Sequence, residues 1–226
     1  MRIFENFKEM YSEVGRDLKE LGIWRHSHSV QNIVIQEGDN RFDMMELIGY
    51  CFKLNSLSGQ SHITEDELSW ILSETQDRFS NFPLNPGNAW VHRRKIWEPF
   101  LVNGKFEYTY SERLCDQIPY IVNELQNKPG TRQAVLTMFR SDDQRYMGGT
   151  RRIPCSLTYQ FLLRDDKLHT IYSMRSCDYF THFKFDVILT WLMAGRIADK
   201  VGVGQGSLTM IIGSFHAFRK DLEGIF

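Results

Sequence analysis

Apolar residues recur at steps of three and four over several stretches of the chain, which is the spacing of an amphipathic helix. The first stretch covers residues 4–21, and Gly22 follows it as a helix-ending residue. Thr64, followed three residues later by Glu67, has the pattern of a capping box at the start of another helix. The spacing predicts helices over residues 4–21, 42–52, 65–79, 114–125 and 185–198.

The second half of the chain alternates apolar and polar residues with the two-residue period of β-strands. Residues 81–104 differ from both patterns, because they are rich in proline, glycine and tryptophan, and we expect a long functional loop there. Helices followed by strands predict an α/β (α+β) fold. No repeat or linker divides the sequence, so we expect one domain over residues 1–226. The expected strands cover residues 32–35, 134–139, 157–163, 168–174 and 208–218.

The composition is that of an ordinary folded protein, with 42% hydrophobic and 24% charged residues. The net charge of -1 supplies no overall field that would attract a nucleic-acid polymer or an anionic membrane. The four cysteines form no CxxC pair, which argues against a disulfide scaffold and a zinc site. No apolar run reaches the roughly 20 residues that span a bilayer. We therefore expect a cytoplasmic protein that binds no metal.

Cys155 is a candidate nucleophile, because it follows Arg151 and Arg152 at the start of a predicted strand. A cationic neighbourhood favours the thiolate, which is the reactive form of cysteine. The alternative is a buried cysteine that packs as a small apolar residue.

Other polar residues interrupt apolar stretches or end predicted strands. Asp186 and Glu46 each lie in an otherwise apolar predicted helix, where a carboxylate either faces solvent, interacts with the helix N-terminus or binds a buried polar ligand. Arg175 and Ser176 could hold a phosphate through an arginine fork and a hydroxyl. In the alternative interpretation they form an ordinary strand end, with Asp178 capping the next segment. The triplet Arg93-Arg94-Lys95 is more typical of a solvated face than of a nucleic-acid patch.

Four short motifs follow one another in the second half of the chain. They are Ile153-Pro154-Cys155 with Tyr159-Gln160-Phe161, Arg175-Ser176-Cys177-Asp178, Phe185-Asp186, and Gly213-Ser214-Phe215-His216. Their order and spacing resemble those of the thymidylate synthase superfamily, which includes the (deoxy)cytidylate 5-hydroxymethylases. The resemblance implies one mixed β-sheet with helices packed on one face, and an obligate homodimer formed through the sheet.

The resemblance also implies roles for individual residues. Cys155 would attack C6 of a pyrimidine nucleotide, so that C5 can take a one-carbon unit from 5,10-methylenetetrahydrofolate. Glu46 would organise water and move protons around the base, and Tyr108 would order the surroundings of the thiol. The implied substrate-binding residues are Arg175 and Ser176 at the phosphate, Arg132 at the phosphate of a neighbouring subunit, His216 at the sugar, Gln160, and Arg25 as a candidate for a further phosphate contact. The implied folate-binding residues are Trp97, Phe100, Asp178 and Phe185.

Asp186 stands where thymidylate synthases are expected to carry an asparagine that binds uracil. A carboxyl group suits cytosine, because it can accept a hydrogen bond from the N4 amino group while a shared proton satisfies N3. Uracil would oppose its O4 to a carboxylate oxygen and leave two acceptors facing each other. The leading hypothesis is therefore a hydroxymethylase that acts on CMP or dCMP. A thymidylate synthase acting on dUMP and an inactive nucleotide-binding relative are the alternatives.

Of two departures from the family pattern, the first leaves one phosphate contact open and the second leaves the sugar preference open. Gln133 replaces the second arginine of the pair expected to cross to the neighbouring subunit. Phe218 stands where a tyrosine would share the sugar hydroxyl with His216. The sequence therefore does not separate CMP from dCMP.

Overall fold

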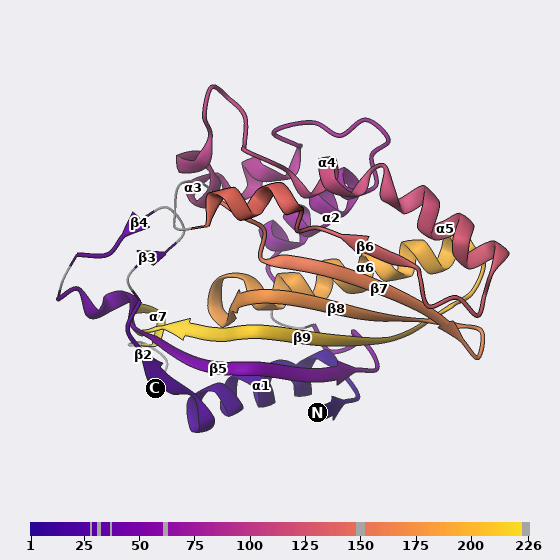
Figure 1. Cartoon of the computed structure of the whole chain (residues 1–226). Helices are drawn as coiled ribbons and strands as arrows, with labels where there is room; N and C mark the ends of the chain where they lie inside the picture. The colour runs from indigo at the N-terminus through magenta and orange to yellow at the C-terminus, as the bar shows by residue number, and fades with distance from the viewer. Residues whose placement is uncertain (28, 31–32, 37, 61–62, 148–151, 223–226) are drawn as a thin grey trace.

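A mixed β-sheet forms the centre of the protein in a computed structural model that describes residues 1–27, 29–30, 33–36, 38–60, 63–147 and 152–222. Within these residues the sheet has seven strands in the order β1-β5-β9-β8-β7-β6, and β2 pairs with β5 (Figure 1). Strands β1 and β5 are parallel, as are β8 and β9, and the other neighbours are antiparallel. The strands are β1 Arg2–Phe4, β2 Ile23–Arg25, β5 Met44–Leu54, β6 Val135–Thr137, β7 Ser156–Arg164, β8 Lys167–Asp178 and β9 Gly204–Phe218, and β3 Ser29–Val30 pairs separately with β4 Ile33–Val34.

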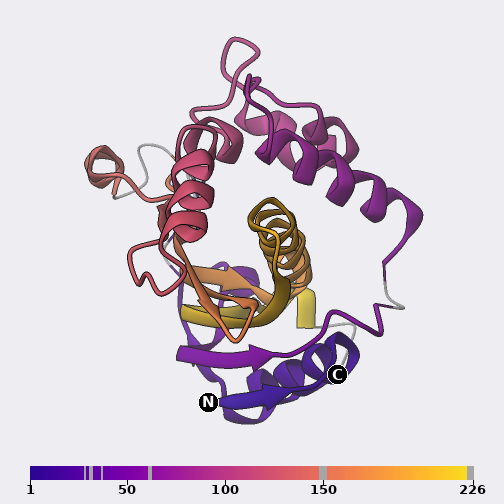
Figure 2. The same cartoon turned by 90° about the vertical axis from the view of Figure 1, so that its right-hand side faces the viewer.

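The helices form further layers over the sheet. Helix α6 lies against β8 and β9, and α2 and α5 lie outside α6, as seen when the sheet is viewed along its strands (Figure 2). Helix α6 has buried residues around most of its circumference because it is covered on both sides. The helices are α1 Phe7–Leu21, α2 Glu65–Arg78, α3 Arg94–Trp97, α4 Tyr110–Leu114, α5 Gln117–Asn127, α6 Lys184–Val201 and α7 Arg219–Leu222, with short turns η1 Asn40–Phe42, η2 Ala89–Arg93, η3 Glu98–Phe100, η4 Ser141–Tyr146 and η5 Tyr179–Phe183.

An aromatic cluster fastens the N-terminal helix α1 to the sheet and to the start of α6. The Tyr11 ring on α1 stacks on Tyr179, with the ring centroids 5.0 Å apart. Phe183, which directly precedes α6, packs against Phe52 on β5 and Phe215 on β9. Large buried aromatic side chains contribute strongly to core stability. The first and last thirds of the chain therefore share one core.

Most of the expected elements are confirmed. The helices predicted over residues 4–21, 65–79 and 185–198 correspond to α1, α2 and α6, and Thr64 and Glu67 form the predicted capping box. The four strands predicted in the second half correspond to β6, β7, β8 and β9. The α/β class and the single mixed sheet with helices are confirmed as well.

Other expectations differ from the structure. The helix predicted over residues 42–52 is wrong, because this segment forms strand β5, and three strands of the sheet come from the first 54 residues. A short apolar run buried in a sheet has no clear period and is easily confused with a buried helix. The loop predicted over residues 81–104 contains η2, α3 and η3, and the helix predicted over residues 114–125 is split between α4 and α5. Of the strand predicted over residues 32–35, Ile33 and Val34 form β4, and Asn32 lies outside the described residues.

Candidate active site

The strand register places polar residues of three neighbouring strands side by side. On the central strand β9, His216 pairs with Glu46 of β5 on one side and with Asp178 of β8 on the other. Two residues earlier, Ser214 pairs with Ser176 of β8. Residues far apart in the sequence are therefore held in two adjacent rows by backbone pairing.

A glycine permits the close approach of β8 and β9 at this point. A Cβ atom at Gly213 would lie 2.8 Å from the carbonyl oxygen of Arg175, closer than packed atoms approach. On the neighbouring strand β5, Gly49 has φ +68, a conformation that favours glycine. Such irregularities redirect side chains at the edges of functional sites. The strand ends beyond them carry the polar rows.

Cys155 lies directly before β7, and the Arg175 side chain holds the segment that carries it. The Arg175 Nε donates to the carbonyl oxygen of Pro154 at 2.9 Å, and Nη2 donates to that of Ile153 at 3.2 Å. The Sγ atom of half-buried Cys155 is 3.6 Å from Arg175 Nη2 and 3.6 Å from Ser176 Oγ. A guanidinium group and a hydroxyl at this distance can stabilise a thiolate. The structure thus brings together the predicted nucleophile and the predicted phosphate-binding pair.

Glu46 is largely buried within this arrangement. The Ser214 hydroxyl donates a short hydrogen bond to its Oε1, and the Arg25 Nε lies 4.0 Å from its Oε2. The His216 Nδ1 lies 3.4 Å from Ser214 Oγ. Arg25 therefore faces Glu46 in this structure. Since Glu46 lies on a strand, the expectation that it belongs to a helix is wrong, although its side chain is held among polar partners.

Asp178 caps the turn that leads into α6. Its Oδ1 accepts hydrogen bonds from the backbone N–H groups of Phe180 at 3.0 Å and Thr181 at 3.4 Å. This is the capping role that the sequence left open beside folate binding. Its second carboxylate oxygen has no hydrogen bond among the described contacts and can still meet a ligand.

Asp186 lies in the first turn of α6, between the sheet and α2. Burial raises the pKa of its carboxyl group to about 6, while the positive charges of Arg78 and Arg93 act against this rise. The thiol of Cys177 donates to its Oδ2 across 3.6 Å. A carboxyl group with this pKa is present in both protonation states near neutral pH.

Tyr108 is enclosed near the thiol. Burial raises the pKa of its hydroxyl to about 12, and the charge of Cys155 contributes to the rise. The Arg113 guanidinium lies 4.3 Å from the centre of the Tyr108 ring and forms a buried ion pair with Asp143. Tyr108 therefore stays a neutral hydroxyl at physiological pH, and a buried cation–carboxylate pair supports its ring.

Trp97 and Phe100 surround a cation. The Arg152 guanidinium lies 4.5 Å from the centre of the Trp97 ring and 4.7 Å from that of Phe100. His182 lies 6.4 Å from the Trp97 ring, measured between ring centres. Burial and the charge of Arg93 lower the pKa of His182 to about 4, so this side chain is neutral at pH 7. The aromatic faces and a neutral imidazole form a wall suited to a flat heterocycle.

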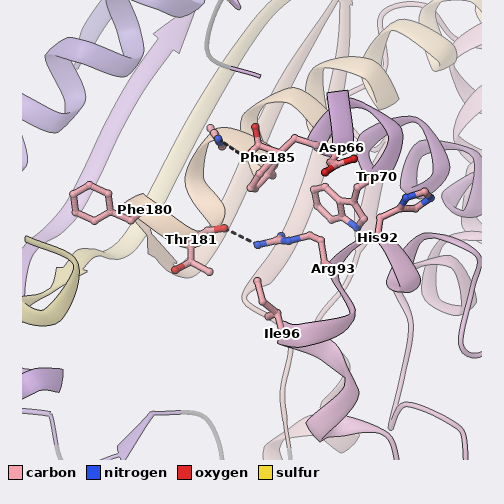
Figure 3. Close-up of a pocket in the computed structure, with 10 residues that line it drawn as sticks. Asp66, Trp70, His92, Arg93, Ile96, Phe180, Thr181 and Phe185 are labelled. Atoms are coloured by element: carbon pink, nitrogen blue, oxygen red, sulfur yellow. Dashed lines mark hydrogen bonds and ion pairs between the residues drawn. The ribbon is translucent and has the colours of Figure 1, made fainter. Parts of the chain in front are cut away.

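A cavity of about 340 Å³ lies between α2, the η2–α3 segment and the start of α6 (Figure 3). Arg93 crosses it and donates to the carbonyl oxygen of Thr181 at 3.1 Å, with its guanidinium 4.7 Å from the ring centres of both Trp70 and Phe185. Within the described part of the chain, no carboxylate forms an ion pair with Arg93. The expectation of a solvated face is confirmed for Arg94 and Lys95, which are exposed, and is wrong for Arg93. The cavity is lined by Asp66, Glu67, Trp70, His92, Arg93, Ile96, Phe180, Thr181, Lys184 and Phe185.

Arg132 and Gln160 lie elsewhere, at the β6–β7 side of the sheet. The Gln160 Nε2 donates to the carbonyl oxygen of exposed Arg132 at 3.0 Å. Gln160 is five residues along the strand from Cys155, which corresponds to roughly 16 Å in an extended chain. A single chain therefore does not bring these two residues to the thiol.

The described residues contain no group of three or more His, Cys, Asp and Glu side chains arranged to hold a metal ion. A separate inspection of the described helices finds none that is both long enough and apolar enough to cross a membrane.

Comparison with known proteins identifies the family of the chain. A family model described as thymidylate synthase matches residues 11–225. The chain belongs to the thymidylate synthase family. It is 30% identical over 162 residues to the "Putative thymidylate synthase" of Methanococcoides burtonii, covering 66% of this chain and 72% of that protein. It is 25% identical over 207 residues to the "Thymidylate synthase" of Buchnera aphidicola, covering 84% of this chain and 77% of that protein.

As a thymidylate synthase family enzyme, the chain has the chemistry of one-carbon transfer from methylenetetrahydrofolate to a pyrimidine nucleotide. Sequence reasoning missed two side chains that the structure places in contact with candidate site residues. One is Arg93 in the cavity, and the other is Cys177 against Asp186. The signal for Arg93 was a loop with tryptophans close to a basic triplet, whereas nothing in the local pattern predicts the partner of Cys177.

Proposed function

We propose that this protein is a homodimeric cytidylate 5-hydroxymethylase, which converts CMP or dCMP into the 5-hydroxymethyl nucleotide through a covalent bond between Cys155 and C6 of the base. The observation that carries the proposal is the enclosed carboxyl group of Asp186, whose pKa near 6 lets it hold a proton when it meets a base. Thymidylate synthesis from dUMP is the competing function.

Cys155, Arg175 and Ser176 supply nucleophile and phosphate binding. The Cys155 thiolate forms a bond to C6, and the C5–C6 electron pair moves to C5, which becomes nucleophilic. Arg175 has one edge hydrogen-bonded to the backbone beside Cys155, so its guanidinium is fixed where the 5'-phosphate would anchor the nucleotide. The distances of 3.6 Å from the sulfur to Arg175 and Ser176 support both roles for one compact site.

Asp186 supplies the choice of base. In its protonated form the carboxyl group donates from one oxygen to cytosine N3 and accepts on the other from the N4 amino group. Uracil has a hydrogen on N3 and a carbonyl at O4. The ionised carboxyl group opposes O4 with a second acceptor, and the acid pairs with uracil only when its proton is on the other oxygen. Leaving a buried donor or acceptor unpaired costs about 1–3 kcal/mol. This polarity favours a cytidine nucleotide.

Glu46 and its partners supply proton transfer. The Glu46 carboxylate, hydrogen-bonded by Ser214 and close to His216, can hold a water beside the base and move a proton to or from the ring. C5 takes the methylene carbon, and loss of the C5 proton with departure of tetrahydrofolate leaves an exocyclic methylene group. In a hydroxymethylase, water then adds to this methylene carbon and gives up a proton. Release of Cys155 restores the ring.

The folate supplies the one-carbon unit, and the aromatic wall and the cavity fit such a molecule. Trp97, Phe100 and Phe185 supply aromatic rings for contact with a pterin and a benzoyl group, and each of them has a guanidinium group over one face. Arg93 offers a guanidinium without a carboxylate partner among the described residues, and folates carry carboxylates at the far end. Asp178, with one carboxylate oxygen engaged in capping, can use the other toward the pterin.

A homodimer accounts for Arg132 and Gln160, which lie away from the thiol of their own chain. Two large apolar side chains on the central strands are also exposed. Ile48 on β5 has 76% of its surface accessible, and Ile211 on β9 has 42%. A second copy could cover these residues and present Arg132 to the phosphate in the other subunit. We also retain a cytoplasmic location as an expectation, because the four cysteines are free and free thiols are typical of reducing compartments.

Release of the C5 hydrogen from CMP, dCMP and dUMP labelled at C5, each with methylenetetrahydrofolate, tests the proposal. We expect release from at least one cytidine nucleotide, with a product heavier by one hydroxymethyl group. Release from dUMP alone, with a methylated product, would show thymidylate synthesis. Nucleotide binding without any release would show an inactive relative.

A further inference from the structure

Cys177 is a buried residue that follows Arg175 and Ser176 in the sequence and precedes Asp178. Its side chain contacts the carboxyl group of Asp186. Only 3% of its surface is accessible, and its Sγ lies 3.6 Å from Asp186 Oδ2. Burial raises the pKa of the thiol well above its ordinary range, and the neighbouring charge of Asp186 raises it further. The thiol is therefore protonated at neutral pH and has one hydrogen to donate. Two acceptors lie within its reach, Asp186 Oδ2 at 3.6 Å and the carbonyl oxygen of Asp178 at 4.0 Å, and the carboxyl oxygen is the nearer.

The other groups that face Asp186 act through charge. Arg78 and Glu74 approach it from α2, and Arg93 approaches it from η2. Tyr110 on α4 and Tyr172 on β8 also lie within range of its charge. Among the described residues, Cys177 is the one hydrogen-bond donor to the Asp186 carboxylate. The contact therefore distinguishes Oδ2 from Oδ1.

We propose that Cys177 is a positioning residue for base recognition: its thiol marks Oδ2 of Asp186 as the accepting oxygen, so that the proton of the carboxylic acid resides on Oδ1. This inference rests on the proposed role of Asp186 in binding cytosine. Oδ2 then accepts from the N4 amino group of the base, and Oδ1 donates to N3. A carboxylic acid can carry its proton on either oxygen, and the neutral thiol favours the arrangement in which Oδ1 donates and Oδ2 accepts.

A thiol suits this task because it is a weak hydrogen-bond donor. It orders the carboxyl group and gives little stabilisation to the ionised form, which must not dominate if N3 is to receive a proton. A hydroxyl in its place would stabilise the carboxylate more strongly, and a methyl group would not stabilise it at all. Cys177→Ser and Cys177→Ala should therefore change the titration of Asp186 in opposite directions.

Titration of the Asp186 carboxyl carbon by ¹³C NMR in the full-length protein without nucleotide tests the contact directly, with Asp186→Asn to assign the signal. We expect the pKa of Asp186 to rise in Cys177→Ala and to fall in Cys177→Ser, each by about half a unit. At a fixed pH this is about a threefold change in the ratio of the protonated to the ionised carboxyl group. A purely structural role would move both variants in the same direction. Equal shifts, or none, would overturn the inference.

Binding of CMP, dCMP and dUMP to the same variants provides the second measurement. We expect Cys177→Ala to lower the preference for cytosine over uracil about threefold, whereas Cys51→Ala, at a cysteine on a different strand, leaves it unchanged. If Cys177→Ala does not fold, Cys177→Ser alone still tests the direction of the pKa change.

The two proposals fail in different ways. An unchanged base preference in Asp186→Asn would contradict the proposed function, while the NMR titration would still report whether the thiol acts on Asp186. A changed preference in Asp186→Asn, with no effect of either Cys177 variant on titration or preference, would contradict only the role of Cys177.

Discussion

The two sides of the candidate site are built differently. On the sheet side, Glu46, His216 and Asp178 are aligned by backbone pairing of three adjacent strands, and Cys155 is held by hydrogen bonds from Arg175 to the neighbouring backbone. On the loop side, Trp97 and Phe100 come from short helical turns and are joined to the rest through contacts between arginines and aromatic rings.

This difference separates two tasks. Covalent chemistry needs atoms fixed to within fractions of an ångström, and a hydrogen-bonded sheet supplies that rigidity. Binding of a large co-substrate needs surface area and tolerates adjustment, which loops with aromatic side chains provide. We therefore expect substitutions on the sheet side to change turnover, and substitutions on the loop side to change the concentration of folate required.

Removing the sulfur should have the largest effect. Cys155→Ser should reduce release of the C5 hydrogen by at least about a thousandfold, because a hydroxyl beside Arg175 is a much poorer nucleophile toward C6. Calorimetric binding of the nucleotide should change less than about threefold, since Arg175 and Ser176 remain. A variant that keeps substantial turnover would show that the sulfur is not the nucleophile.

Changing the carboxyl group on α6 should have the next largest effect. Asp186→Asn should shift the ratio of C5-hydrogen release from cytidine nucleotides to release from dUMP by about a hundredfold toward dUMP, because the amide donates to O4 and accepts from N3–H. Competition between CMP and dUMP in one reaction measures this ratio. Cys51→Ala serves as the control and should leave it unchanged.

The same substitution should alter the pH dependence of stability. Burial raises the pKa of Asp186 from 3.8 to about 6, so its contribution to stability is present below pH 3.8 and lost as the pH rises through 6. Asp186→Asn removes this loss and should raise the free energy of unfolding by about 1–3 kcal/mol at pH 8. Urea unfolding should show the difference shrinking toward pH 4. An equal gain at both pH values would contradict the burial of this charge.

A substitution on the loop side should have the smallest effect and a different signature. Arg93→Ala should raise the KM for methylenetetrahydrofolate about tenfold and leave kcat within about twofold, since it removes a contact used in binding alone. Arg94→Ala is the matched control, because the neighbouring Arg94 is exposed and paired with Glu98. A large fall in kcat for Arg93→Ala would contradict the proposal that the loop side contributes to folate binding and not to turnover.

Part of this architecture was predictable from sequence, because short stretches of the chain determine it. The capping box at Thr64, the long apolar helix α6 and the alternating strands β7, β8 and β9 each follow from periodicity over a few residues. The motifs around Cys155 and Arg175 indicated the chemistry, because cysteine, arginine and serine at strand ends form a compact set of reactive and anion-binding groups.

Other features were not predictable, because they depend on contacts between distant segments. Strand β5 is an apolar run whose extended form is decided by pairing with β9, whose paired residues lie 154 to 174 positions later in the chain. The burial of Arg93 depends on Trp70 from α2 and Phe185 from α6. Local patterns do not specify which distant rings a cation will meet.

The sequence by itself determined the family, the candidate nucleophile and the presence of an acid where an amide would bind uracil. Only the tertiary structure decided the state of that acid, because its pKa depends on burial between the sheet and α2 and on the charges around it. It also decided which groups share the site, since the pairing of β5, β9 and β8 and the packing of α6 bring together residues from opposite ends of the chain.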